Sequence, residues 1–206
     1  MKHLKKSIWL LFASLLPGYN LPAQSHDEGA SLGVKFGVNV TNYNIKEANL
    51  KTAPGFNLGI FSNAALSKHF SLQPEINLNI QNVNINVNNE LSNSQYNLLL
   101  SYVELAITGR VSCRKVYLQA GPYISYLANS TISNNNINDA MNRKNFYDID
   151  YGLIYSGGLQ LKRWDLGIRF NHGMYEIGKP YTSEKNLNIF RNSKTSSFQL
   201  YAGYYF

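Results

Sequence analysis

Four charged residues stand where they could do chemistry: Lys35, Glu75, Glu104 and Arg169, each within a stretch of alternating apolar and polar residues. Successive side chains of a strand point to opposite faces, so the alternation puts all four on polar faces. If these strands closed into a barrel and placed the four residues at similar heights, the two carboxylates and two cations would neutralise one another. The layer could be a binding or proton-handling site. The sequence favours a structural ion network, because side chains can fill the interior of a narrow barrel.

A hydrolase arrangement is the main enzymatic alternative. His172 could activate Ser156, with Glu176 or Asp150 orienting the imidazole ring. No spacing motif supports this set, and the sequence contains no phosphate-binding glycine loop and no metal-ligand spacing. We therefore expect no catalytic residue, no metal, no cofactor and no enzymatic activity.

Cys113 is the single cysteine. A lone thiol cannot form an internal disulfide, and no second thiol or histidine cluster stands ready to share a metal. We interpret it as an unpaired residue in a short turn.

The clearest element that could position these residues is the stretch TSSFQLYAGYYF, residues 195–206. Its alternation places Phe198, Leu200, Tyr204 and Phe206 on one apolar face. In water, an uncovered strand edge with an apolar row would invite aggregation. Both problems disappear if the strand closes a barrel and its apolar face meets lipid. The stretch therefore predicts the closing strand of a membrane β-barrel.

The same alternation predicts seven further strands, over residues 31–40, 55–64, 70–81, 96–111, 116–126, 149–161 and 164–171. Long polar connections follow every other strand, at residues 41–54, 82–95, 128–147 and 172–194. The remaining connections are short turns. Outer-membrane barrels have long loops outside and short turns in the periplasm. The sequence thus predicts an all-β protein, an eight-stranded antiparallel up-and-down transmembrane β-barrel with both chain ends in the periplasm.

The first residues have the layout of a secretory signal peptide. Lys2, Lys5 and Lys6 precede an apolar run at residues 8–16, and Pro17 and Gly18 follow it. The run is too short to cross a bilayer as a helix. We expect residues 1–24 to be the signal peptide and residues 25–206 the barrel domain, exported to the outer membrane of a Gram-negative bacterium.

The charge balance argues against a nucleic-acid partner. The chain has 19 basic and 12 acidic residues, and without the three leader lysines the net charge is +4. The basic residues are scattered, with no run of five or more. The expected partners are outer-membrane lipid, the barrel-assembly machinery during insertion, and a protein that the long loops could contact.

Several short stretches together resemble the PorT-like outer-membrane β-barrel family of Bacteroidetes. They are QPEI at residues 73–76, YVELA at 102–106, GPY at 121–123, DYGL at 150–153 and RF at 169–170, with Phe206 at the end. Ala106 stands where a proline is common in that family, and Phe170 where a tyrosine is common. The resemblance implies an eight-stranded outer-membrane barrel and supplies no catalytic residues. One branch of the family takes part in protein secretion, but no residue here selects that branch.

Our leading hypothesis is a non-enzymatic outer-membrane barrel with a filled lumen, whose outer loops contact partners or the surroundings. The alternatives are a porin-like channel for small solutes, a lipid-modifying barrel enzyme and a component of a secretion system. A soluble lipocalin-like barrel is the main alternative for the fold. In that case the apolar faces of the strands would point inward and the charges outward.

Overall fold

The computed structural model describes residues 30–43, 50–89, 92–134, 137–139, 147–176, 178 and 194–206. The expected signal peptide, residues 1–24, lies outside this part of the chain. The strands are β1 (Ser31–Tyr43), β2 (Leu50–Ala65), β3 (Phe70–Asn89), β4 (Ser92–Cys113), β5 (Val116–Asn134), β6 (Ile137–Asp139), β7 (Ile149–Leu161), β8 (Trp164–Glu176) and β9 (Lys194–Tyr205). Among these described residues there is no helix long and apolar enough to cross a membrane.

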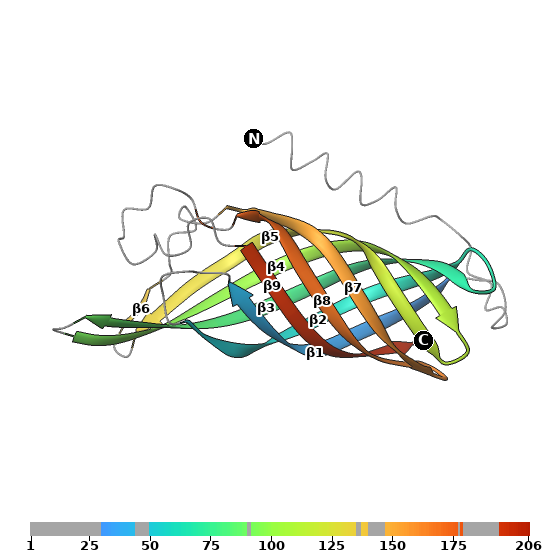
Figure 1. Ribbon diagram of the computed structural model, residues 1–206, viewed down its shortest axis with the longest axis horizontal. Coiled ribbons are helices and arrows are strands. Elements are labelled where there is room, and N and C mark those ends of the chain that lie inside the picture. The colour runs from blue at the N-terminus through green and yellow to red at the C-terminus, as the bar shows by residue number, and fades with distance from the viewer. Residues whose placement is uncertain are drawn as a thin grey trace.

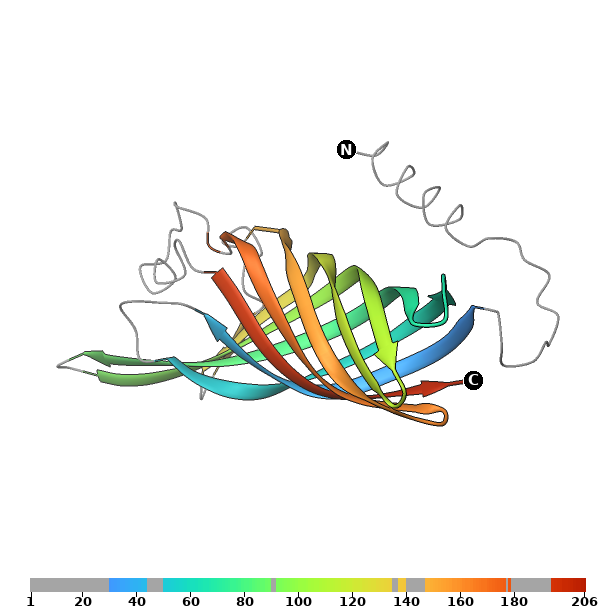
Figure 2. The same ribbon diagram turned by 45° about the vertical axis from the view of Figure 1, so that its right-hand side comes forward.

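Eight of these strands form one closed antiparallel barrel (Figures 1 and 2). The sheet runs in the order β4-β3-β2-β1-β9-β8-β7-β5, and pairing of β4 with β5 closes it. The strand β6 pairs only with the far end of β5, where Ile132 faces Asp139, and takes no part in closure. The first and last barrel strands pair from Gly33–Tyr205 to Tyr43–Thr195. The predicted fold is confirmed.

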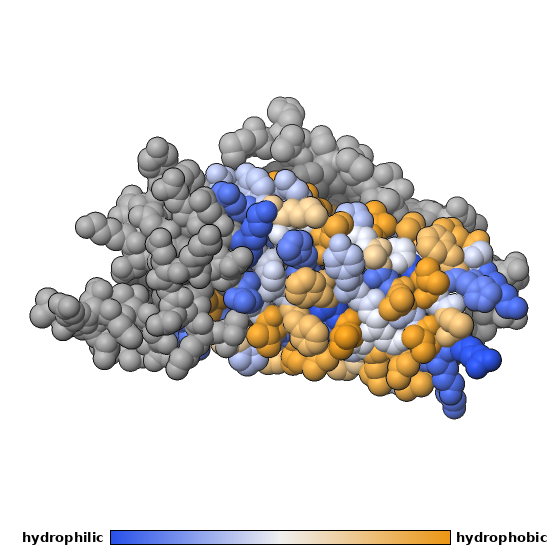
Figure 3. All heavy atoms as spheres, viewed as in Figure 1, coloured by the Kyte–Doolittle hydropathy of each residue, from blue (hydrophilic) through white to orange (hydrophobic). Residues whose placement is uncertain are grey.

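The outer wall of the barrel is apolar and its interior is polar. Large apolar side chains such as Phe56, Leu118 and Ile168 are 60%, 66% and 51% exposed on the outside. Figure 3 shows apolar residues spread over one face of the barrel wall. The alternate positions carry buried polar residues, among them Asn57 and Gln119. A soluble lipocalin-like barrel needs the opposite arrangement, so this alternative for the fold is wrong.

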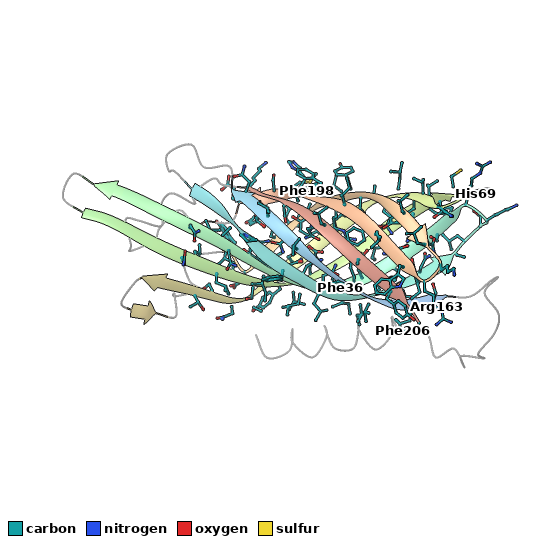
Figure 4. The ribbon with its side chains drawn as sticks, turned by 90° about the horizontal axis from the view of Figure 1, so that it is seen from below. Phe36, His69, Arg163, Phe198 and Phe206 are labelled. Carbon is teal, nitrogen blue, oxygen red and sulfur yellow. The ribbon has the colours of Figure 1, made fainter. Side chains whose placement is uncertain are left out.

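The strand β9 shows the same division of faces. Phe198 and Leu200 are exposed on the outer face, and Phe206, just beyond the strand, is also exposed. Figure 4 shows Phe198 and Phe206 well apart along the barrel. The ring of Tyr204 lies on this face, 5.0 Å from Trp164 and 6.1 Å from Phe206, measured between ring centroids. The four residues thus form one apolar and aromatic row on the outer wall.

The long polar connections are shorter than predicted, because several strands continue into them. Residues 82–89 and 92–95 form a two-stranded extension in which β3 and β4 stay paired as far as Asn89–Ser92. Similarly, β1 runs to Tyr43, β2 begins at Leu50, β5 runs to Asn134 and β8 to Glu176. Backbone pairing does not require an apolar face, so a ladder can continue through polar sequence where the alternation ends.

Two glycines give the fold a matched test. A Cβ atom at Gly121 would overlap the carbonyl oxygen of Ile107 and the backbone of Thr108, whereas at Gly109 the nearest atoms are ring carbons of Phe70 at 3.5 Å. We expect Gly121→Ala to lower the free energy of unfolding by about 1–3 kcal/mol through overpacking. Gly109→Ala should be close to neutral. Reversible unfolding in detergent measures both, and equal effects would contradict the close approach of β4 and β5.

Candidate functional site: the lumenal charge network

The structure brings the four charged residues together inside the barrel. Lys35 comes from β1, Glu75 from β3, Glu104 from β4 and Arg169 from β8, and each residue is at most 2% exposed. Neighbouring strands are in a register that places Glu75 opposite Phe61, and Glu104 opposite Asn77. Residues up to 134 positions apart in sequence thus share one layer, because the closed barrel returns β8 to face β3.

Glu75 is the centre of this network. Its Oε1 atom accepts from Lys35 Nζ at 2.8 Å and from Arg169 Nη2 at 2.6 Å. Gln73 Nε2 donates to the same oxygen at 2.8 Å, and Asn77 Nδ2 donates to Oε2 at 3.1 Å. Two buried cations and two amides therefore surround one buried carboxylate. Charge-assisted bonds of this kind are stronger than bonds between neutral groups.

Glu104 is held differently, mainly by neutral amides. Asn79 and Asn171 donate to its Oε2 atom at 3.0 and 2.9 Å, and Asn77 donates to Oε1 at 3.0 Å. The closest cationic atom, Arg169 Nη1, is 4.0 Å from Oε1. Glu104 is therefore attached to the network through Asn77 and a longer ion pair, whereas Glu75 touches both cations directly.

Aromatic rings line the network on the side of β9. Lys35 Nζ lies 4.7 Å from the ring centroid of Tyr201, and the guanidinium carbon of Arg169 lies 5.5 Å from the same centroid. The hydroxyl groups of Tyr201 and Tyr117 form a hydrogen bond of 2.8 Å across the lumen. Cations over a ring face are attracted by its electron density, which offsets part of the loss of water.

A second ion pair lies nearer the end where the barrel strands are joined by short turns. Arg110 on β4 contacts both carboxylate oxygens of Asp165 on β8, with Nη2 donating to Oδ1 at 3.2 Å. Tyr205 donates to Asp165 at 2.9 Å and accepts from Arg110 at 2.8 Å. Gln73 joins the two layers, because its Oε1 atom accepts from Arg110 at 3.4 Å while its Nε2 donates to Glu75.

Sequence reasoning missed this second pair. The alternation of residues 96–111 and 164–171 puts Arg110 and Asp165 on polar, inward faces. No local signal in the sequence pairs β4 with the opposite wall. Which inward residues meet across a lumen depends on strand tilt and stagger. The Arg110–Asp165 pair could have been suggested only by working out the tilt and stagger of the strands in an eight-stranded barrel.

The hydrolase arrangement does not form. His172 is exposed on the outer wall, where its ring stacks on Phe170 at 6.3 Å, while Ser156 is buried inside and donates to Gln119 at 3.0 Å. Asp150 accepts from Tyr123 at 3.2 Å within the lumen. The proposed base and nucleophile thus lie on opposite faces of the wall.

Two further features concern metals and thiols. Across the described ranges, no group of three or more His, Cys, Asp or Glu side chains is placed to hold a metal ion. Cys113 is exposed and free at the end of β4, beside the turn that begins at Arg114.

A closed eight-stranded barrel with an apolar outer wall and a polar, charged interior defines a transmembrane β-barrel of an outer membrane. The chain belongs to the family described as outer membrane protein beta-barrel domain, whose model matches residues 22–177. The protein is therefore located in the outer membrane of a Gram-negative bacterium, and its outer wall contacts lipid.

Solved structures similar to this chain are outer-membrane proteins. Neisserial surface protein A has a TM-score of 0.52 and 12% identity, with 87% of this chain and 100% of that chain covered. Ail of Yersinia pestis, solved with the heparin analogue sucrose octasulfate, has a TM-score of 0.46 and 12% identity, covering 86% and 99%. OprG of Pseudomonas aeruginosa has a TM-score of 0.44 and 12% identity, with 90% of this chain and 99% of that chain covered. No curated protein matches. At this identity, the likeness to Neisserial surface protein A concerns the fold.

Proposed function

We propose that this protein is a non-enzymatic outer-membrane barrel whose lumen is closed by the charge network and whose long-loop end contacts partners or the surroundings. The observation that carries the proposal is the meeting of Lys35 and Arg169, from separate parts of the wall, on Glu75. The bond from Arg169 runs across the lumen, because β8 and β3 lie on opposite sides of the barrel, and Lys35 joins it from β1. A solute passing through would have to break these bonds.

Several layers of side chains support closure. Arg110, Asp165 and Tyr205 bond to one another near the short-turn end, and Tyr117 and Tyr201 bond across the lumen. All of these residues are at most 6% exposed. An eight-stranded barrel is about wide enough for side chains to fill, so this packing is what its diameter allows.

The orientation and processing of the chain are part of the same proposal. Short turns join β2 to β3, β4 to β5 and β7 to β8, and we place this end in the periplasm, since outer-membrane barrels have their short turns there. Residues 1–24 would be removed after export, and residues 25–206 would form the barrel domain. The barrel-assembly machinery would then act on the chain from the periplasmic side.

A channel for small solutes is the second candidate. It is favoured by buried polar atoms of the described residues that have no hydrogen-bond partner within the protein, among them Arg169 Nε and Nη1, Asp150 Oδ1 and the Tyr102 hydroxyl. Such atoms could contact a small polar solute. Two further hypotheses are the PorT-like assignment, with its secretion branch, and a lipid-modifying barrel enzyme. No residue of the described part of the chain favours either of them.

Solute uptake by liposomes separates a closed barrel from a porin-like channel. Liposomes that contain the purified protein should swell in small sugars no faster than protein-free liposomes, because the bonds to Glu75 cross the lumen. A general porin in the same lipid provides the positive control. Swelling that increases with the amount of folded protein would favour the channel.

A further inference from the structure

The short turns of the barrel carry a concentration of basic side chains. We call this set the basic rim; it consists of Lys68, His69, Arg114, Lys115, Lys162 and Arg163. Each of the three turns contributes two of these residues, and all six are exposed. In sequence, the three pairs are separated by more than 40 residues, so they do not form a basic run.

The topology gathers these pairs at one end of the barrel. Because the strands are antiparallel, the turns after β2, β4 and β7 all fall at the end where β1 begins and β9 finishes. Figure 4 shows His69 and Arg163 at this end, with Phe206 near Arg163. The two tight turns begin at Arg114 and Lys162, whose φ angles of 54° and 56° are left-handed. Each of these turns has two residues and joins directly paired strand ends, Cys113–Val116 and Leu161–Trp164.

No described carboxylate side chain offsets the charge of the basic rim. Asp165 lies near this end but is 3% exposed and already bonded to Arg110 and Tyr205. The exposed carboxylates Asp148 and Glu176 belong to the opposite end of β7 and β8. Five permanent cations and one histidine thus face the solvent without an acidic side chain of the described residues among them.

The basic rim borders directly on the apolar outer wall. Leu66, Phe70, Val116, Leu161 and Trp164 flank the three turns, and each is 40–62% exposed on the lipid side. Trp164 packs on Tyr204, and aromatic side chains of this kind mark the level of lipid headgroups. The cations therefore stand at the depth where phosphate groups of a phospholipid leaflet lie.

We propose that the basic rim is a binding site for anionic phospholipid headgroups in the leaflet at the short-turn end. Arginine can hold a phosphate with two parallel bonds, and lysine acts as a compact charge that several headgroups can share. Bound lipids would fill the space between the turns and anchor this end of the barrel at a fixed depth. The assignment of that leaflet to the periplasmic side depends on the orientation proposed above; the lipid preference does not.

Lipid retention by the purified protein tests the proposal. The full-length mature protein is equilibrated in mixed micelles of phosphatidylglycerol and phosphatidylethanolamine, and the retained lipids are counted by native mass spectrometry. We expect phosphatidylglycerol to be enriched about fivefold or more over its share of the mixture, the preference that one basic residue near an anionic surface gives. Raising the salt concentration to about 1 M should reduce the enrichment, because it shortens the screening length to about 3 Å.

A variant with a neutral rim supplies the decisive comparison. It carries Lys68→Gln, Lys115→Gln, Arg163→Gln, Arg114→Asn and Lys162→Asn, with asparagine at the two left-handed positions because it tolerates that conformation. Folding is checked by the heat-dependent shift in gel mobility. The share of phosphatidylglycerol among the retained lipids should fall to its share of the mixture. Should this variant not fold, the matched single changes Lys115→Gln and Lys194→Gln still test the location of the lipids. Lys194 lies at the opposite end of the barrel, so only Lys115→Gln should reduce the retention of phosphatidylglycerol.

Two results would overturn the proposal. One is a wild-type protein that retains both lipids in the ratio of the mixture; the rim would then face some other anionic partner, such as an acidic protein. The other is an enrichment that Lys115→Gln and Lys194→Gln reduce equally, which would locate the lipids elsewhere. Neither result bears on whether the lumen is closed, because the assay does not measure transport.

Discussion

Replacing Glu75 with alanine should lower the free energy of unfolding by about 3–5 kcal/mol, the cost typical of removing one partner from a buried ion pair. The change leaves the ammonium group of Lys35 and the guanidinium group of Arg169 together in the lumen, without the carboxylate that both now contact at 2.8 and 2.6 Å. Reversible unfolding by urea in detergent or lipid measures the loss.

A double-mutant cycle tests whether this cost belongs to the network. Glu75→Ala combined with Arg169→Met should cost less than the two single changes added together, because the double change removes the guanidinium group that Glu75→Ala alone leaves unpaired. Glu104→Ala should cost less than Glu75→Ala, since amides hold Glu104 and its closest cationic atom is 4.0 Å away. Additive costs at Glu75 and Arg169 would contradict the network.

Arginine on the lipid face should have the second large effect. Ile168 and Leu200 face each other on β8 and β9, both about 51% exposed on the outer wall. They lie between the Trp164–Tyr204 ring pair and the Phe170–His172 ring pair. We expect Ile168→Arg or Leu200→Arg to cost about 2–4 kcal/mol, the range measured for charges near the bilayer midplane. Unfolding into urea from lipid vesicles gives the value.

The matched control keeps the new side chain and changes only its depth. Leu66 is exposed in the turn after β2, at the boundary of the apolar band. Leu66→Arg should cost about 0–1 kcal/mol, since the penalty falls toward the interfaces. If Leu66→Arg and Ile168→Arg proved equally costly, the assignment of the outer wall to the membrane core would be wrong.

The faces of the strands could be predicted from the sequence because the strand period ties side-chain direction to position. The consecutive Leu98, Leu99 and Leu100 show the limit of this reasoning. Glu104 and Arg110 on the inward face fix the phase of β4, and Leu99 accordingly points outward. Leu98 and Leu100 point inward and are buried, which an alternating apolar pattern does not anticipate.

The strand ends and the cross-lumen contacts could not be predicted in the same way. The asparagine-rich residues near Asn89 stay in a backbone ladder whose hydrogen bonds leave no pattern in the side chains. Similarly, the pairing of Arg110 with Asp165 depends on barrel stagger. The basic rim is not a run in the sequence, since Lys68, Arg114 and Lys162 are distant from one another. The predicted alternation of the strands nevertheless brings their turns to one end, and the structure has the same arrangement.

The measurement that tests the closed lumen most directly is the conductance of the purified, folded protein in a planar bilayer. With Lys35 and Arg169 both bonded to Glu75 across the interior, we predict no steady conductance above that of the bare membrane. Heat-denatured protein from the same preparation is the control for contaminating porins. A stable open level in the folded wild-type protein, with an ion preference that Glu104→Gln alters, would contradict the closed lumen and favour the channel.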